Sequence, residues 1–169
     1  MEILVDKTQE WLKENNIYFL NNVNLSLKSW IKAGGIVKTF IQPDSVQKCQ
    51  ELIKFFLKEK INFYVLGNQS NIIVRDGIIE TPIINFIKLS DIQLNKLPDG
   101  LHIACGSGVP ISRFSKNASD QGYSGAEGIL GIPGSIGGGI CMNASSYDSH
   151  LATYIKEVKV LSNNGELLI

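Results

Sequence analysis

The alternation of apolar and polar residues predicts a chain of mixed helices and strands. Val5–Asn15 places apolar side chains three and four residues apart, which predicts a short amphipathic helix packed on the body of the protein. Asn24–Pro43 alternates on both sides of Gly34 and Gly35, which predicts two strands joined at a glycine bend. There the missing Cβ lets the backbone turn or approach a ligand.

A capped helix and a further strand are predicted after Pro43. Asp44 or Ser45 is a suitable N-cap, and the helix that follows has an apolar stripe with a period of three to four residues. Ile61–Gly67 then reads as a strand, so the order strand, helix, strand predicts a βαβ-type unit. Because Cys49 lies in the apolar stripe, we interpret it as a core residue rather than a nucleophile.

The middle of the chain predicts two more strands and a boundary between lobes. Asn71–Gly77 reads as a strand, and Ile78–Phe86 as another, interrupted at Pro82. The polar stretch Leu89–Gly100, which ends in a Pro-Asp-Gly turn, reads as a connection.

Beyond this connection we predict a strand in Leu101–Gly108, a helix that begins at Pro110, and a strand in Tyr154–Leu161. A hairpin turn at Ser162–Gly165 leads into a return strand, within which the sequence stops. The pattern therefore divides the chain into an N-terminal helical segment (1–22), a first lobe (23–90) and a second lobe (91–169). We expect the second lobe to be incomplete and the chain to be a fragment.

Composition narrows the classes of partner. Hydrophobic residues make up 44% of the 169 residues, and 16 basic residues balance 16 acidic ones. No basic excess favours nucleic acid, and no apolar run is long enough to span a bilayer. The charged N-terminus does not resemble a secretory signal, and the odd, widely spaced cysteines read as reduced thiols of a cytoplasmic protein. His102 and His150 lack partners at metal-ligand spacing, so no metal site is predicted.

The glycine-rich run Gly131–Gly139 is the most biased segment, and it fits neither common nucleotide motif. A P-loop requires a Gly-Lys pair, which this chain lacks. Gly106 and Gly108 begin a dinucleotide fingerprint correctly, but Ile111 occupies the third glycine position. Because isoleucines are interspersed with the glycines, we favour a ligand-contacting loop over a flexible linker. Ser135–Gly139 would form a helical turn whose free N–H groups face a phosphate.

A second candidate loop is Gly67–Asn71, where successive backbone amides can form an anion-binding nest. Taken alone, it is better explained as an ordinary turn between strands. Together, the two loops resemble the UDP-N-acetylenolpyruvoylglucosamine reductases, also called UDP-N-acetylmuramate dehydrogenases. Gly67–Asn71 is similar to that family's G-x-G-S-N loop, and Gly131–Gly139 with Met142-Asn143-Ala144 to its G-I-P-G-S-x-G-G and M-N-A segments. Ser29–Gly35 resembles its N-terminal bend.

The resemblance implies an α+β fold of two lobes that hold FAD, of the vanillyl-alcohol-oxidase type and not a Rossmann fold. Gly67–Asn71 would wrap the pyrophosphate, and the glycine-rich run would line the diphosphate and isoalloxazine. The implied cofactor-binding residues are Gly67, Asn68, Gln69, Ser70, Asn71, Gly131, Ile132, Pro133, Gly134, Ser135, Gly137, Gly138 and Asn143. Lys32 and Tyr147 are placed on the flavin or substrate side; an exposed hairpin lysine is the alternative for Lys32.

The implied activity is a flavoprotein oxidoreductase of peptidoglycan synthesis, with roles in cell wall biogenesis, cell shape and the cell cycle. NADPH would reduce FAD, and the flavin would reduce UDP-N-acetylglucosamine enolpyruvate to UDP-N-acetylmuramate. An enolate formed in this way needs cations and an acid. The family's catalytic groups and substrate domain are expected beyond Ile169. The alternatives are a non-catalytic flavin-binding or interaction module, or a related flavin oxidoreductase with another substrate.

Several positions depart from the family pattern. Gln69 replaces a loop glycine, so its side chain must point away from the phosphates or crowd them. Ser145 and His150 fall where the family has a glycine and an acidic residue, and Asp76-Gly77-Ile78 replaces D-G-G. These changes affect the substrate side more than the cofactor side. We also expect self-association through an open sheet edge.

Overall fold

The computed structural model describes residues 2–169, with side chains from residue 5 onward. The chain forms two compact units. Unit 1 runs through Lys88 and also contains Lys159–Ile169, and unit 2 is Leu89–Val158. The sequence pattern placed the boundary at residue 90 and assigned residues 159–169 to the second lobe. These last residues group with unit 1 because the Gly165 carbonyl accepts a hydrogen bond from Gln50 Nε2 at 3.1 Å.

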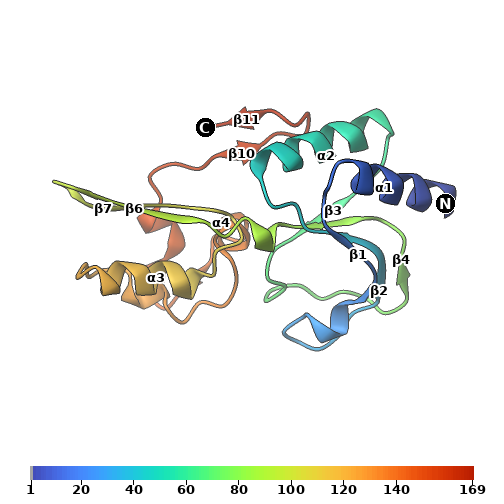
Figure 1. The fold of residues 1–169 in the computed structure, drawn as a ribbon. Helices are drawn as coiled ribbons and strands as arrows, with labels where there is room; N and C mark the ends of the chain where they lie inside the picture. The colour runs from blue at the N-terminus through green and yellow to red at the C-terminus, as the bar shows by residue number, and fades with distance from the viewer. Residues whose placement is uncertain (1) are drawn as a thin grey trace. The chain divides into compact units, whose positions relative to one another are not determined.

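Unit 1 is built on a five-stranded mixed sheet (Figure 1). The strand order is β1-β2-β5-β3, and β4 also pairs with β2. β1 lies antiparallel to β2, whereas β2, β5 and β3 are parallel. The strands are β1 (Phe19–Asn24), β2 (Ile36–Ile41), β3 (Tyr64–Leu66), β4 (Ile78–Ile79) and β5 (Ile83–Asn85). β5 lies between the two strands of the predicted βαβ unit, so β2 and β3 are not neighbours.

Two helices pack on this sheet and close its core. The predicted first helix is α1 (Glu2–Glu14), and β1 then crosses the expected segment boundary at residue 22. Trp11 of α1 stacks on Phe55 of α2 (Val46–Lys58), with ring centroids 4.2 Å apart and planes 6° from parallel. Leu12 and Phe56 are fully buried in the same cluster. Burial of these aromatic and aliphatic side chains stabilises the packing of the two helices.

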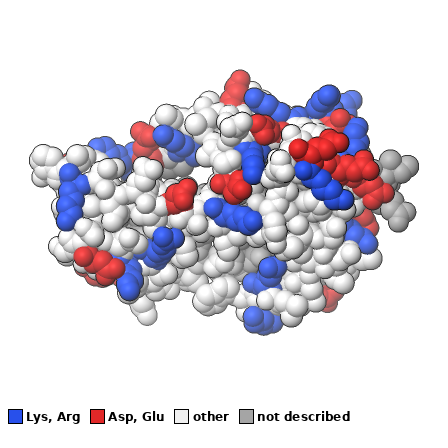
Figure 2. Space-filling view, viewed as in Figure 1, with Lys and Arg blue, Asp and Glu red and all other residues white. Residues whose placement is uncertain are grey.

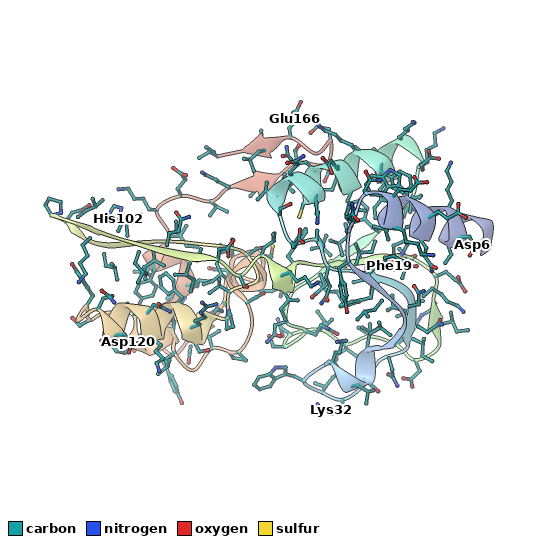
Figure 3. All side chains as sticks on the ribbon, in the orientation of Figure 1. Asp6, Phe19, Lys32, His102, Asp120 and Glu166 are labelled. Atoms are coloured by element: carbon teal, nitrogen blue, oxygen red, sulfur yellow. The ribbon has the colours of Figure 1, made fainter. Side chains whose placement is uncertain are left out.

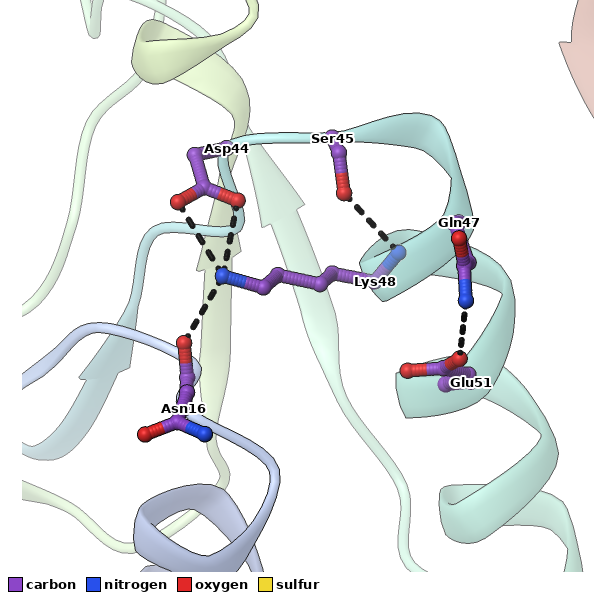
Figure 4. A network of polar contacts seen from close by, with 6 residues as sticks. All are labelled: Asn16, Asp44, Ser45, Gln47, Lys48 and Glu51. Carbon is purple, nitrogen blue, oxygen red and sulfur yellow. Dashed lines mark hydrogen bonds and ion pairs between the residues drawn. The ribbon is translucent and has the colours of Figure 1, made fainter.

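Figure 4 shows the polar contacts that fix the start of α2. Ser45 is the N-cap, and its Oγ accepts a hydrogen bond from the Lys48 amide at 3.2 Å. Lys48 Nζ lies 3.0 Å from a carboxylate oxygen of Asp44 and donates to the Asn16 carbonyl at 2.8 Å. The predicted helix start is thus confirmed, with Ser45 rather than Asp44 as the cap.

Cys49 lies inside unit 1, with 1% of its surface exposed. Burial, assisted by the nearby Asp44 charge, raises the pKa of its thiol to about 12. Because the thiolate is the reactive form, Cys49 is inert at neutral pH. Its interpretation as a core residue rather than a nucleophile is confirmed.

Two strand predictions in unit 1 were wrong. The stretch before the glycine pair contains a 3-10 turn, η1 (Leu25–Leu27), and a loop, so only β2 is a strand there. Asn71–Gly77 is irregular, and β4 begins at Ile78. A Cβ on Gly35 would lie 2.1 Å from the Gly77 carbonyl oxygen, so backbone packs directly on backbone at this point. This close approach is where β2 and β4 begin to pair, since the Ile36 amide donates to the same Gly77 carbonyl at 2.8 Å. The break predicted at Pro82 is present between β4 and β5.

Unit 2 combines a hairpin with short helices. The hairpin joins β6 (Ile92–Leu97) to β7 (Gly100–Cys105), so the stretch predicted as a polar connection is largely a strand. β6 is mostly exposed, so its polar residues resemble those of a loop and do not indicate a strand. The Pro-Asp-Gly turn is where it was predicted, and α3 (Ile111–Asp120) begins after Pro110 as predicted. The remaining elements are η3 (Glu127–Ile129), α4 (Ile136–Cys141), β8 (Ser145–Ser146), β9 (Ser149–His150) and η4 (Leu151–Tyr154).

The end of the chain forms the predicted hairpin in unit 1. β10 (Val160–Leu161) pairs with β11 (Leu167–Leu168) across the Ser162–Gly165 turn. The strand expected from Tyr154 is therefore much shorter than predicted, because η4 continues to Tyr154. Among the described residues, no helix combines the length and the apolar character needed to cross a bilayer.

Replacing Ser45 with alanine tests the cap of α2. We expect S45A to lower the free energy of unfolding by about 1 kcal/mol, because the Lys48 amide loses its partner. Urea denaturation followed by circular dichroism measures this loss. The control is Q47A, which removes only the exposed contact with Glu51 and should change stability by less than about 0.5 kcal/mol. Equal effects of the two substitutions would contradict the capping role.

Candidate functional site

In unit 1, the loop Gly67–Asn71 is held at its first residue by a buried amide side chain. Asn85, at the end of β5, is 2% exposed, and its Nδ2 donates to the carbonyls of Leu66 and Gly67 at 3.0 and 2.8 Å. Its Oδ1 accepts a hydrogen bond from Gln42 Nε2 at 3.0 Å. Asn85 was not predicted from the sequence. The available signal was a polar residue directly after two apolar strand residues, Ile83 and Ile84.

Gln69 has unusual geometry within this loop. Its backbone lies in the left-handed region, with φ of 56°, a conformation that costs a non-glycine residue about 1 kcal/mol. The residue is 8% exposed, and its Oε1 is buried without a hydrogen-bond partner among the described residues. An unsatisfied buried acceptor costs about 1–3 kcal/mol. Gln69, which departs from the family pattern, therefore has both a strained backbone and an unsatisfied hydrogen-bond acceptor.

The loop that carries Lys32 contacts the Gly67–Asn71 loop. The Trp30 amide donates to the Gln69 carbonyl at 3.3 Å, so these two predicted segments lie together in unit 1. Figure 3 shows Lys32 on the loop between η1 and β2. Its backbone is left-handed, with φ of 56°, and its side chain is exposed.

In unit 2, the isoleucines of the glycine-rich segment are buried anchors. Ile129, Ile132 and Ile136 pack with Val109 and Leu151 in one cluster. This packing excludes a flexible linker and fixes the residues between the anchors. Among those residues, Gly131 and Pro133 are exposed. A Cβ built on Gly131 meets no atom within 4 Å. The fold itself therefore does not require glycine at position 131.

The predicted helical turn is present as α4, but its N–H groups are not free. The Ile136 amide donates to the Val109 carbonyl at 2.7 Å and the Gly137 amide to the Ser107 carbonyl at 2.8 Å. The Gly138 amide donates to Ser135 Oγ at 3.4 Å, which makes Ser135 the N-cap. The prediction that these N–H groups are free was wrong, because Val109 and Ser107, which follow β7, supply acceptors for the first two and Ser135 for the third.

The remaining predicted residues of unit 2 lie at turns. Asn143 follows α4 with φ of 46°, a left-handed residue at a helix end. Tyr147 is at the tip of the β8–β9 hairpin, with its side chain fully exposed. Ser145 and His150, two of the departures from the family pattern, are paired residues in that hairpin. Among the side chains of residues 5–169, no three His, Cys, Asp or Glu groups are placed to hold a metal ion.

The profile of the FAD binding domain family matches residues 37–169 of this chain. The chain belongs to the FAD-binding domain family. The match covers the two candidate loops, Gly67–Asn71 and Gly131–Asn143, and the hairpin that bears Tyr147. It begins after Lys32.

Reductases are found among the relatives of this FAD-binding domain. UDP-N-acetylenolpyruvoylglucosamine reductase of Clostridium kluyveri is 36% identical over 138 residues, which are 82% of this chain and 44% of the relative. The enzyme of the same name from Caldanaerobacter subterraneus is 34% identical over 99% of this chain and 54% of the relative. The chain thus spans about half the length of the curated relatives that it matches. The resemblance predicted from the sequence motifs is confirmed.

Two solved structures share the fold of this FAD-binding domain. UDP-N-acetylenolpyruvylglucosamine reductase of Thermus caldophilus superposes with a TM-score of 0.71 at 22% identity, over 90% of this chain and 52% of that one. Cholesterol oxidase of B. sterolicum gives a TM-score of 0.59 at 18% identity, over 78% of this chain and 25% of that one. The predicted α+β, vanillyl-alcohol-oxidase-type FAD-binding fold is confirmed.

Substitution of Gly137 and Gly131 distinguishes a glycine that the fold requires from one that it does not. We expect G137A to lower the free energy of unfolding by about 1 kcal/mol. Its Cβ would lie 2.7 Å from Ser107 Cβ, so overpacking of about 1–3 kcal/mol exceeds the helix propensity that alanine adds. G131A should stay within about 0.5 kcal/mol of the parent protein. Thermal and urea unfolding measure both effects, and a G137A protein as stable as its parent would refute the argument.

Proposed function

We propose that this chain binds FAD, and that the loops Gly67–Asn71 and Gly131–Asn143 supply its cofactor-binding residues. The proposal rests first on Gly131, a glycine in the matched region that is exposed and has no neighbour against which a Cβ would clash. Glycine is useful at such a position when a ligand must lie close to the backbone. The cofactor-binding residues proposed are Gly67, Asn68, Gln69, Ser70, Asn71, Gly131, Ile132, Pro133, Gly134, Ser135, Gly137, Gly138 and Asn143.

The residues present suit a dinucleotide in polarity and in rigidity. Asn85 holds the start of the first loop, and the buried isoleucines hold the second, so little conformational freedom is lost on binding. The unsatisfied Gln69 Oε1 offers an acceptor to a ligand donor. Figure 2 shows acidic and basic side chains interspersed over α1 and α2, with no single-sign patch on the visible face. The loops Gly67–Asn71 and Gly131–Asn143 contain no charged side chain, so backbone and neutral polar groups would recognise the cofactor.

We further propose that this chain takes part in the reaction for which its relatives are named, that of UDP-N-acetylenolpyruvoylglucosamine reductase. FAD, held by the two loops, would supply the chemistry of hydride transfer from NADPH to the enolpyruvyl group of the UDP-sugar. This chain's part would be to orient the flavin by its backbone loops. Lys32 and Tyr147 are both exposed on loops, and we propose them for the flavin or substrate side.

Cellular context follows from this proposed reaction. A cytoplasmic location and roles in cell wall biogenesis, cell shape and the cell cycle belong to peptidoglycan precursor synthesis. The three free cysteines, one buried, one half-buried and one exposed, fit a reducing compartment. Self-association through an open sheet edge also stays a prediction; β1 and β3 are the ends of the strand order in unit 1.

Flavin retention tests cofactor binding directly. The purified chain should carry visible flavin absorbance, or take up added FAD in equilibrium dialysis. G131A should bind FAD about tenfold more weakly, a loss of ~1.4 kcal/mol, because the added methyl group enters the space of the ligand. Unchanged stability of G131A would show that the loss concerns binding. A chain that takes up no FAD would refute the proposed function.

Activity is tested by following NADPH absorbance with the FAD-loaded chain. We expect NADPH oxidation that requires UDP-N-acetylglucosamine enolpyruvate and yields UDP-N-acetylmuramate, measured by mass spectrometry of the products. Omission of the UDP-sugar is the control. Retained FAD with no substrate-dependent oxidation would contradict the reductase activity of this chain and favour a flavin-binding module without catalysis.

A further inference from the structure

Trp30 differs from the other tryptophan of the chain in having no ring partner. Its side chain is 61% exposed, and among the side chains of residues 5–169 no aromatic ring or cation is paired with the indole. Trp11, in contrast, stacks on Phe55. Leu27, at the end of η1, and Ile31, in the same loop as Trp30, are also exposed, at 77% and 51%. Of the three side chains, only Trp30 has a flat aromatic face on which a planar ring can stack.

The backbone under Trp30 is held in place. Ser29 is 1% exposed, and its Oγ donates to the Ala33 carbonyl at 2.8 Å while its amide donates to the Leu25 carbonyl at 2.8 Å. The Trp30 amide donates to the Gln69 carbonyl at 3.3 Å. The indole therefore projects from a fixed backbone position beside the Gly67–Asn71 loop. Pre-organisation of this kind lowers the entropic cost of binding a ligand.

Gln69 supplies an independent indication of a ligand at the same place. Its side chain is more than nine-tenths buried, and Oε1 has no hydrogen-bond partner among the described residues. Oε1 can only accept a hydrogen bond, whereas a phosphate oxygen offers no hydrogen. The group that satisfies it must therefore be an amino, imino or hydroxyl donor. Both ring systems of FAD, adenine and isoalloxazine, carry N–H donors on a flat aromatic frame.

We propose that the Trp30 indole stacks on a flat ring of the bound dinucleotide, while Gln69 Oε1 accepts a hydrogen bond from that ligand. This inference rests on the proposed FAD binding and refines it. The Gln69 side chain meets a ring or hydroxyl donor, and the pyrophosphate is left to the backbone of the loop. Aromatic stacking also explains why a large apolar side chain is exposed on a well-ordered loop.

Substitution of Trp30 tests the stacking. W30A should bind FAD about fivefold to a hundredfold more weakly in equilibrium dialysis, the range expected for loss of one stacked base. W30F should keep most of the affinity, because phenylalanine can still stack. The control is L27A, since Leu27, at the end of the neighbouring η1, is also an exposed apolar residue but has no ring. Equal FAD affinities of W30A and the parent chain would overturn the proposal.

Shorter ligands identify which ring is involved. FMN contains the isoalloxazine without adenine, and ADP contains adenine without the isoalloxazine. The ligand whose affinity falls in W30A, but not in L27A, carries the ring that stacks on Trp30. If neither affinity falls, the indole stacks on neither ring and the proposal fails. A chain that binds none of the three ligands before substitution would instead refute the proposed function.

Gln69 is tested by methionine, which keeps the length of the side chain and removes its acceptor. Q69M should weaken FAD binding at least threefold, while its melting temperature stays equal to or above that of the parent chain. Removal of an unsatisfied buried polar group does not destabilise the free protein. A purely structural role would give the opposite pattern, with a lower melting temperature and unchanged FAD affinity, and would overturn this part of the proposal.

Discussion

Direct packing of backbone on backbone at glycines is the constraint that positions irregular segments in both units. Gly35 lies against the Gly77 carbonyl in unit 1, and in unit 2 Gly106 lies as close to the Leu89 carbonyl. Gly137 packs against Ser107, whose carbonyl accepts the Gly137 amide. A side chain at any of these positions would separate the two segments. Such contacts hold irregular loops as firmly as a sheet holds its strands, since each combines close packing with hydrogen bonds.

This constraint divides the glycines into two kinds. Gly106 and Gly137 are explained by neighbours within the fold, so they are no evidence for a ligand. Gly131 has no such neighbour and is exposed. The apparent dinucleotide fingerprint at Gly106 and Gly108 is thus a packing motif. The same reasoning applies to polar groups: the amides at the start of α4 are satisfied by the protein, whereas Gln69 Oε1 is not. Two features that the fold leaves unused are therefore the open space beside Gly131 and the hydrogen-bond acceptor Gln69 Oε1.

Rigidity connects the packing to the proposed function. The first loop is attached at Gly67 by Asn85, and the second is anchored by buried isoleucines on either side of its exposed glycine. Trp30 and Gln69 are joined through their backbones, so the exposed indole and the buried amide belong to one fixed arrangement. A dinucleotide cofactor has flat rings, which an aromatic side chain can stack on, and a charged pyrophosphate at its centre. Backbone N–H groups of loops can bind the pyrophosphate without a basic side chain.

The sequence by itself determined the family, the α+β class, the start of the helix after Pro43 and the core position of Cys49, because these depend on local spacing and on residue type. It did not determine the pairing of strands: β5 lies between β2 and β3, and the polar residues of β6 concealed a strand. It also misjudged the amides of α4 and missed Asn85. Those features depend on acceptors and donors from distant segments, such as the Ser107 carbonyl and Gln42. Only the tertiary structure brings such groups together, since no local pattern records which of them will meet.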